Sequence, residues 1–145
     1  MYKHFAISLL FLIPLVLVSQ PDRPGSGRCL QFGNGNYVNL GTNYTNVSLP
    51  FSFAGWIKVN NNTNVKRIFF TNENNSTYVG FWVQILSDIA IAYGDGTTRS
   101  PAGRRSMLAA FSPQIGVWYH IALVMTGPTS GQIYINGISQ SVSYN

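Results

Sequence analysis

Short runs of residues along the chain alternate between apolar and polar side chains, a period of two that is typical of β-strands with one covered face. The clearest runs lie in residues 117–137, VWYHIALVMTGPTSGQIYING. They predict two strands joined by a polar turn and followed by a tight turn at Asn136-Gly137. Further runs, each bounded by Gly, Pro, Asn or Asp, predict a hairpin over residues 29–40 and strands over residues 51–59, 66–71, 77–86, 89–93 and 106–111.

The spacing of these runs predicts an all-β fold. Residues 51–59 are apolar on both alternating faces, so we expect a central strand there. A strand is favoured over a short helical turn for residues 106–111, and residues 97–105 are predicted to form a polar surface loop. No segment has the apolar spacing of an amphipathic helix over three turns, and turn signals recur about every 8 to 12 residues. This pattern predicts an antiparallel β-sandwich.

The first 28 residues differ in composition from the rest. Residues 1–19 carry Lys3 and His4, then an apolar run, then the small residue Ser19, which is the layout of a signal peptide. We expect cleavage after Ser19, with an uncleaved anchor as the alternative; the apolar run is shorter than the ~20 residues of a membrane span, so none is expected after cleavage. Residues 20–28, rich in Pro and Gly, predict a linker, and residues 29–145 a single domain.

The composition limits the classes of function. Apolar residues make up 46% of the 145 residues, enough for one core, whereas charged residues make up only 9%. The net charge of +5 arises because only four side chains are acidic: Asp22, Glu73, Asp88 and Asp95. The basic residues are scattered rather than gathered in a stripe, so no nucleic-acid partner is expected.

Two single residues have a structural and a chemical interpretation. Cys29 is the only cysteine, so no disulfide forms within the chain, and we expect it to be a small buried residue of the first strand rather than a reactive thiol. His120 is expected to be a hydrogen-bonded structural residue rather than a ligand or general base, because no carboxylate or cysteine has an evident reason to approach it.

Four blocks of sequence, CLQFGNGNYVNLG, FSFAGWIKV, WYHIALVMTG and GQIYING, resemble in content and order the laminin-G-like modules of the concanavalin A-like lectin/glucanase superfamily. The resemblance implies a jelly-roll of two antiparallel sheets. It also implies that Trp56, Trp118, His120 and Tyr134 are structural core residues. The family continues beyond the last block, so the resemblance implies a domain that lacks its last strands. Residues 138–144 would stand in for them or leave an open sheet edge through which the chain self-associates.

The same resemblance suggests two kinds of chemistry to look for, glycoside hydrolysis and Ca²⁺ binding. Related glucanases use carboxylates at alternating positions of one strand, ~5 Å apart in retaining enzymes. No predicted strand here carries two acidic residues, so we expect no enzymatic activity. Some laminin-G modules bind Ca²⁺ on rim loops, where Asp95 would be the ligand; turn formation is the simpler explanation, because Ca²⁺ needs several oxygen ligands.

Ligand-binding candidates follow from side-chain chemistry. Aromatic rings stack on sugars when they are exposed and otherwise pack in the core, and arginines in a polar loop either bind an anionic glycan or are simply solvated. The candidates are Tyr37, Tyr78, Trp82, Tyr93, Arg99, Arg104 and Arg105. Five sequons predict N-glycosylation in a eukaryotic secretory pathway, at Asn43, Asn46, Asn61, Asn74 and Asn75.

The expected function is therefore that of a secreted or surface-exposed, non-catalytic module that recognises a glycan or an extracellular protein through its rim loops or a sheet face. The alternative is a structural or adhesion domain that acts by chain-to-chain association and has no small ligand.

Overall fold

The computed structural model of the chain describes residues 29–41, 48–61, 65–70, 79–85, 87–98 and 103–145. The predicted leader and linker lie outside these ranges. Within them the secondary structure consists of strands and turns, and no helix is long and apolar enough to cross a membrane.

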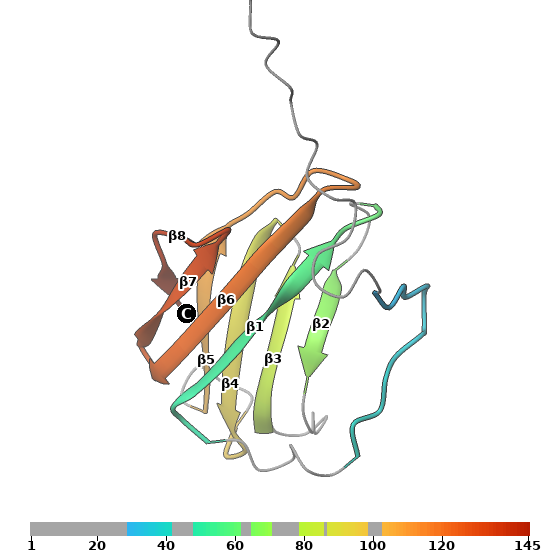
Figure 1. Cartoon of the computed structure of the whole chain (residues 1–145). Coiled ribbons are helices and arrows are strands. Elements are labelled where there is room, and N and C mark those ends of the chain that lie inside the picture. Colours follow the sequence, from blue (N-terminus) through green and yellow to red (C-terminus); the bar gives the residue numbers. More distant parts are fainter. Residues whose placement is uncertain (1–28, 42–47, 62–64, 71–78, 86, 99–102) are drawn as a thin grey trace, which may run out of the picture.

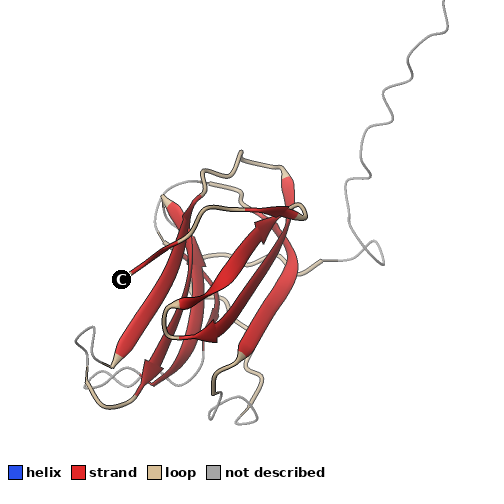
Figure 2. Cartoon of the chain, turned by 90° about the vertical axis from the view of Figure 1, so that its left-hand side faces the viewer, coloured by secondary structure: helices blue, strands red, loops and turns tan. Residues whose placement is uncertain are grey.

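Two antiparallel sheets pack face to face (Figures 1 and 2). The four-stranded sheet has the order β1 (Phe51–Lys58), β6 (Trp118–Gly127), β7 (Ser130–Ile135) and β8 (Ile138–Ser139). The five-stranded sheet has the order β2 (Lys66–Phe70), β3 (Val79–Ile85), β4 (Asp88–Asp95), β5 (Arg104–Ala110) and β9 (Ser143–Tyr144). The predicted all-β sandwich is confirmed.

The core lies between the sheets and is built from alternate residues of each strand. Val83, Ile91 and Met107 from the five-stranded sheet are fully buried, as are Ile121, Leu123 and Ile133 from the four-stranded sheet. Burial of each such side chain stabilises the fold by about 1.5–3 kcal/mol relative to exposure. The period of two in the sequence thus matches the division of each strand into a face towards the core and a face away from it.

The strands predicted over residues 117–137 form β6 and β7, the two central strands of the four-stranded sheet. The turn after β7 is the predicted Asn136-Gly137 turn, and both residues have positive φ, 52° and 79°. Two successive positive φ angles define the tight hairpin turn that matches the twist of antiparallel strands. This turn leads the chain into β8.

Residues 29–41 do not form the predicted hairpin. They contain no strand, and the N–H of Asn36 donates to the carbonyl of Gly33 at 3.2 Å to form a turn. Every residue in this segment is exposed, so the expectation of a buried Cys29 is also wrong. A two-stranded hairpin is marginal in water unless one face is covered, and no strand of the described structure covers this one.

β1 is an edge strand and not the predicted central strand. Its outward-facing positions, including Ala54 and Trp56, are exposed. Their apolar character therefore did not indicate a second covered face.

The strand predicted over residues 106–111 is confirmed as β5, which begins two residues earlier, at Arg104. Residues 138–144 contribute β8 to one sheet and β9 to the other. Asn145 extends the pairing of β9 with β5, because its N–H and carbonyl form hydrogen bonds of 3.0 and 2.8 Å with Ser106. The hydroxyl of Tyr144 donates to the carbonyl of Gly131 at 3.2 Å and so joins the two sheets.

Candidate functional site

Side chains of β3, β4 and β5 that point away from the core form a strip on the outer face of the five-stranded sheet. The strand register places Trp82 beside Ala92 and Ser106, and the next row places Gln84 beside Ala90 and Leu108. We call this the outer strip; it comprises Trp82, Gln84, Asp88, Ala90, Ala92, Arg104, Ser106, Leu108, Ala110 and Ser143.

The middle of the outer strip is made of small residues. Ala90 and Ala92 are only 3% and 1% exposed, although they face away from the core. Their methyl groups lie between the longer side chains of β3 and β5, and Trp82, Gln84 and Leu108 are half-buried. The surface of the strip at this point is therefore formed by the longer side chains and hardly by the two alanines.

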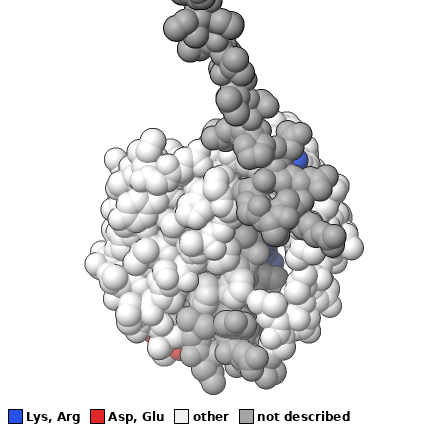
Figure 3. Space-filling model, viewed as in Figure 1, with Lys and Arg blue, Asp and Glu red and all other residues white. Residues whose placement is uncertain are grey.

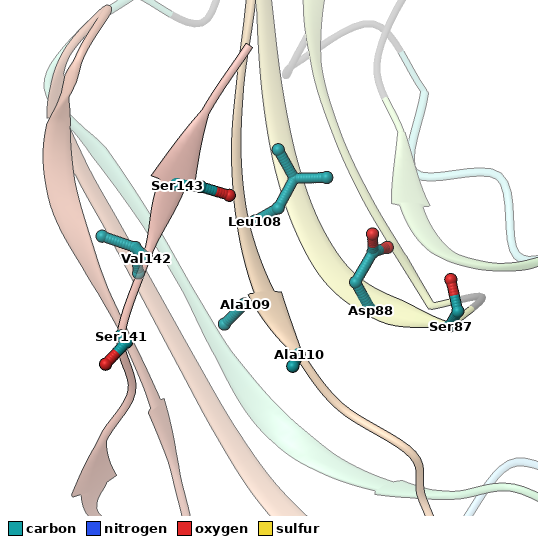
Figure 4. A pocket seen from close by; sticks show the side chains of 8 residues that line it. All are labelled: Ser87, Asp88, Leu108, Ala109, Ala110, Ser141, Val142 and Ser143. Atoms are coloured by element: carbon teal, nitrogen blue, oxygen red, sulfur yellow. The ribbon is translucent and has the colours of Figure 1, made fainter.

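A cleft of about 400 Å³ lies at one end of the outer strip (Figure 4). The pairing of β5 with β9 runs to Leu108 and Ser143, and beyond it the C-terminal segment separates from β5. Figure 4 shows the hydroxyl of Ser143 on the side of the cleft facing Leu108. The cleft is lined by Ser87, Asp88, Leu108, Ala109, Ala110, Ser141, Val142 and Ser143.

The lining of this cleft combines two kinds of group. Asp88 supplies a carboxylate and the three serines supply hydroxyls, whereas Leu108, Val142 and the two alanines supply apolar surface. Binding sites for small polar molecules have this combination, and their volumes are roughly 300–1,000 Å³. The chemistry suits hydrogen bonding to a hydroxylated ligand.

β4 begins at Asp88 and ends at Asp95, so one strand carries two acidic residues, contrary to the expectation that none does. The two residues are seven positions apart, which at ~3.3 Å per residue separates them by roughly 23 Å. Paired carboxylates of glycosidases lie about 5–9.5 Å apart. These two carboxyl groups therefore cannot act on one glycosidic bond.

Asp95 builds a turn at the opposite end of β4. Its Oδ1 accepts hydrogen bonds from the hydroxyl and from the backbone N–H of Thr97, at 2.7 and 2.8 Å. The Thr97 hydroxyl, followed by the Thr97 backbone N–H, holds the pKa of Asp95 below its ordinary value. The N–H of Asp95 donates to the carbonyl of Gly103 at 2.9 Å and closes the base of the loop.

The described residues around Asp95 do not fit a Ca²⁺ site. No group of three or more His, Cys, Asp or Glu side chains is present in the part of the chain that the structure describes. Ca²⁺ takes six to eight oxygen ligands, commonly with more than one carboxylate. Turn formation accounts for Asp95.

The structure brings together two of the predicted ligand-binding residues. Trp82 and Arg104 lie on the same outer face, one row apart in the register, and both are half-buried. Arg105 points the other way, and its Nη1 donates to the carbonyl of Arg104 at 3.0 Å. Both arginines belong to β5 and not to the predicted loop.

The remaining candidates are not part of the outer strip. The ring of Tyr93 faces the interior, with its centroid 6.2 Å from that of Phe51, so the prediction of an exposed stacking platform is wrong there. Tyr37 is 74% exposed in the unpaired segment 29–41. Tyr78 and Arg99 lie outside the described residues. Of the five predicted glycosylation sites, Asn61 is described and exposed, and Asn43, Asn46, Asn74 and Asn75 lie outside the described residues, so glycosylation stays a prediction.

The predicted structural core residues lie on the outer face of the four-stranded sheet. Trp56 is 51% exposed, so its assignment to the core is wrong, and its ring meets that of His120 edge-on at 5.3 Å. Trp118, His120 and Tyr134 are half-buried, and the ammonium of Lys58 lies 5.3 Å from the Trp118 ring centroid. Figure 3 shows that the described surface over β6 and β7 on this face is almost free of charged side chains.

Sequence reasoning missed the residues of the cleft. Ser87 and Asp88 follow the predicted strand 77–86 directly, and Leu108 alternates with the core residues of β5, so their common face could have been inferred. Ser141 and Ser143 had no comparable signal, because β9 is only two residues long.

A family model described as the concanavalin A-like lectin/glucanases superfamily, in its laminin-G form, matches residues 32–144. Comparisons with curated proteins and with solved structures returned no match.

Proposed function

The chain belongs to the laminin-G group of the concanavalin A-like lectin/glucanase superfamily, and from this premise we propose that it is a secreted or surface-exposed, non-catalytic module that binds a glycan on the outer strip. The observation that carries the proposal is the cleft beside β5, whose lining combines one carboxylate and three hydroxyls with apolar side chains. Sugars present hydroxyls at their edges and C–H groups on their faces, so they match such a lining.

Trp82 and Gln84 support the same ligand class. They occupy successive outward positions of β3, and the buried methyl groups of Ala92 and Ala90 lie next to them. An indole ring offers a flat apolar surface for a sugar ring, and a side-chain amide both donates and accepts hydrogen bonds. A glycan lying along β4 would reach from Trp82 to the cleft at Asp88.

The spacing of the acidic residues supports binding without hydrolysis. Asp88 is the carboxylate in the cleft, and the next described carboxylate along its strand is Asp95 at the far end. A carboxylate that lies far from a second carboxylate can still accept hydrogen bonds from sugar hydroxyls. Glycoside hydrolysis needs two such groups on either side of the scissile bond.

A glycan array followed by calorimetry tests this function. We expect Asp88→Asn and Ser143→Ala each to weaken binding of the best array ligand about tenfold, which corresponds to the loss of about one hydrogen bond. Asp95→Asn is the matched control, because it changes the same residue type on the same strand at the other end. Binding should persist in the presence of a chelator, since no cluster of three or more His, Cys, Asp or Glu side chains lies around Asp95 among the residues that the structure describes.

The proposal fails if the folded chain binds no glycan on the array. It also fails if Asp95→Asn weakens binding as much as Asp88→Asn, because the ligand would then lie elsewhere. Release of carbohydrate fragments during the binding assay would overturn the non-catalytic assignment.

A further inference from the structure

On one side of the sandwich the interior is apolar, and no strand of the described structure covers it. It is the side where β1 and β2 are the edge strands, and we call it the open side. The two edge strands face each other across the core, since the ring of Phe53 on β1 lies 5.8 Å from that of Phe69 on β2. Inward-facing side chains there are only half-buried: Phe51, Phe53, Ile57, Ile68 and Phe69.

The free edge of β1 adds backbone groups to this apolar surface. β1 is eight residues long, and β6 pairs with it on one side only within the described structure. A long edge strand presents a row of N–H and carbonyl groups that can pair with another extended chain. Of its exposed side chains only Lys58 is charged, so little on this edge opposes pairing.

The same chain carries a segment with complementary properties. Residues 29–41 contain no charged side chain, and their large apolar side chains are exposed: Leu30 by 71%, Phe32 by 52%, Tyr37 by 74%, Val38 by 52% and Leu40 by 50%. The family model includes residues 32–41, so most of this segment belongs to the family's module and not to a linker. Figure 1 shows that it runs outside both sheets, beyond β2.

We propose that the open side binds residues 29–41 of a second copy of this chain, with part of the segment added as an edge strand beside β1. In the structure the segment stands clear of its own domain, so each copy presents one donor segment and one acceptor edge. Two copies can exchange segments reciprocally, so that both acceptor edges are occupied in a dimer with twofold symmetry. The exchange would cover the half-buried phenylalanines of each acceptor and the exposed apolar residues of each donor.

The length of the segment is sufficient for this contact. Thirteen extended residues span about 43 Å, whereas the eight residues of β1 span about 26 Å. Even after the turn between Gly33 and Asn36, each part of the segment retains enough residues to pair along half of β1.

Disulfide crosslinking between two different chains tests the exchange. The donor is the unaltered chain, in which Cys29 is the only cysteine and is exposed. The acceptor carries Cys29→Ser with Ser52→Cys or with Ala54→Cys, both at exposed positions of β1. We expect oxidation of the mixture to give a mixed dimer linked from Cys29 to position 52 or 54, identified by mass spectrometry, because a disulfide requires Cα atoms within about 7 Å.

A matched acceptor controls for random collision. This acceptor carries Ser139→Cys in the Cys29→Ser background, which places a cysteine on β8, the exposed opposite edge of the same sheet. If the donor segment pairs with β1, this acceptor should give at least about tenfold less mixed dimer. Equal yields from positions 52, 54 and 139 would overturn the proposal. A chain carrying both Cys29 and Ser52→Cys that forms only a disulfide within one molecule would overturn it too, in favour of docking on its own domain.

Sedimentation of charge variants gives a second measurement. Leu30→Asp and Val38→Asp alter exposed residues, so folding should be preserved, and each should weaken dimerisation about tenfold or more by removing an apolar contact. Ile115→Asp and Ile138→Asp change residues that are 59% and 68% exposed elsewhere, and they should leave dimerisation unaltered. A monomer at all concentrations, or a dimer broken only by Ile138→Asp, would overturn the proposal.

Discussion

Asn136 and His120 form two hydrogen bonds that tie the β7–β8 turn to β6. The side-chain Oδ1 of Asn136 accepts from the N–H of His120 at 2.9 Å, and the N–H of Asn136 donates to the carbonyl of His120 at 2.8 Å. Asn136 thereby continues the pairing of β6 with β7 beyond Ile135, while its φ of 52° starts the turn. One residue serves both the sheet and the turn.

Substitutions at Asn136 should separate these two contributions. Asn136→Ala loses the hydrogen bond and places a Cβ residue at positive φ, so we expect a loss of about 2–3 kcal/mol in the free energy of unfolding. Asn136→Gly loses only the hydrogen bond and should cost about 1 kcal/mol, whereas Asn136→Asp keeps an acceptor and should stay within about 0.5 kcal/mol. Urea denaturation measures all three, and equal losses for Ala and Gly would show that the turn geometry contributes nothing.

Gly131 on β7 is packed against Met107 of the opposite sheet. A Cβ atom there would overlap the carbonyl oxygen of Val124 and lie 2.9 Å from the sulfur of Met107. We expect Gly131→Ala to destabilise the fold by about 1–3 kcal/mol through overpacking. Gly127→Ala is the control, because its Cβ would meet nothing closer than 3.6 Å and should change stability by about 0.5 kcal/mol or less. Similar thermal unfolding of both variants would contradict the contact.

The period of two and the turn residues were sufficient to predict the fold class and most strands. They located β6, β7 and the Asn136-Gly137 turn, because each of these is determined by local patterning. Alternation also separated the two faces of each strand, but it did not say which face points inward. The family resemblance implied that Trp56 is a core residue, whereas Phe53 and Ile57 are the β1 residues that face the core.

The candidate site depends on contacts between distant parts of the chain, which patterning cannot show. Asp88 is isolated in the sequence, and it lines the same cleft as Ser141 and Ser143 only because the C-terminal segment returns to pair with β5. The hairpin predicted over residues 29–40 is wrong for a related reason. Their alternation indicates that they are able to form strands, but a strand also requires a neighbour, and the described structure places none beside them.

Asp95 should titrate below its ordinary pKa of 3.8, because hydrogen bonds from the Thr97 hydroxyl and then from the Thr97 N–H favour its ionised form. Since the folded-state pKa lies below the unfolded-state value, the ionised carboxylate stabilises the loop above the unfolded-state pKa. That contribution is lost as the pH falls through the folded-state pKa. Titration of the Asp95 carboxyl by NMR measures this, and Thr97→Val should move its pKa back towards 3.8. An unchanged pKa in Thr97→Val would show that the hydroxyl is not the principal cause.

Trp56 provides the sharpest contrast between the resemblance and the structure. A buried core tryptophan costs about 3–5 kcal/mol when it is replaced by alanine. Trp56 is 51% exposed and its main aromatic contact is the edge of His120, so Trp56→Ala should cost only about 1 kcal/mol. Leu123→Ala, at a fully buried position of the neighbouring strand, should cost about 2–5 kcal/mol and serves as the reference. If the two losses measured by urea denaturation were equal, the outer face of β1 would be covered in solution by another part of the chain or by a second copy.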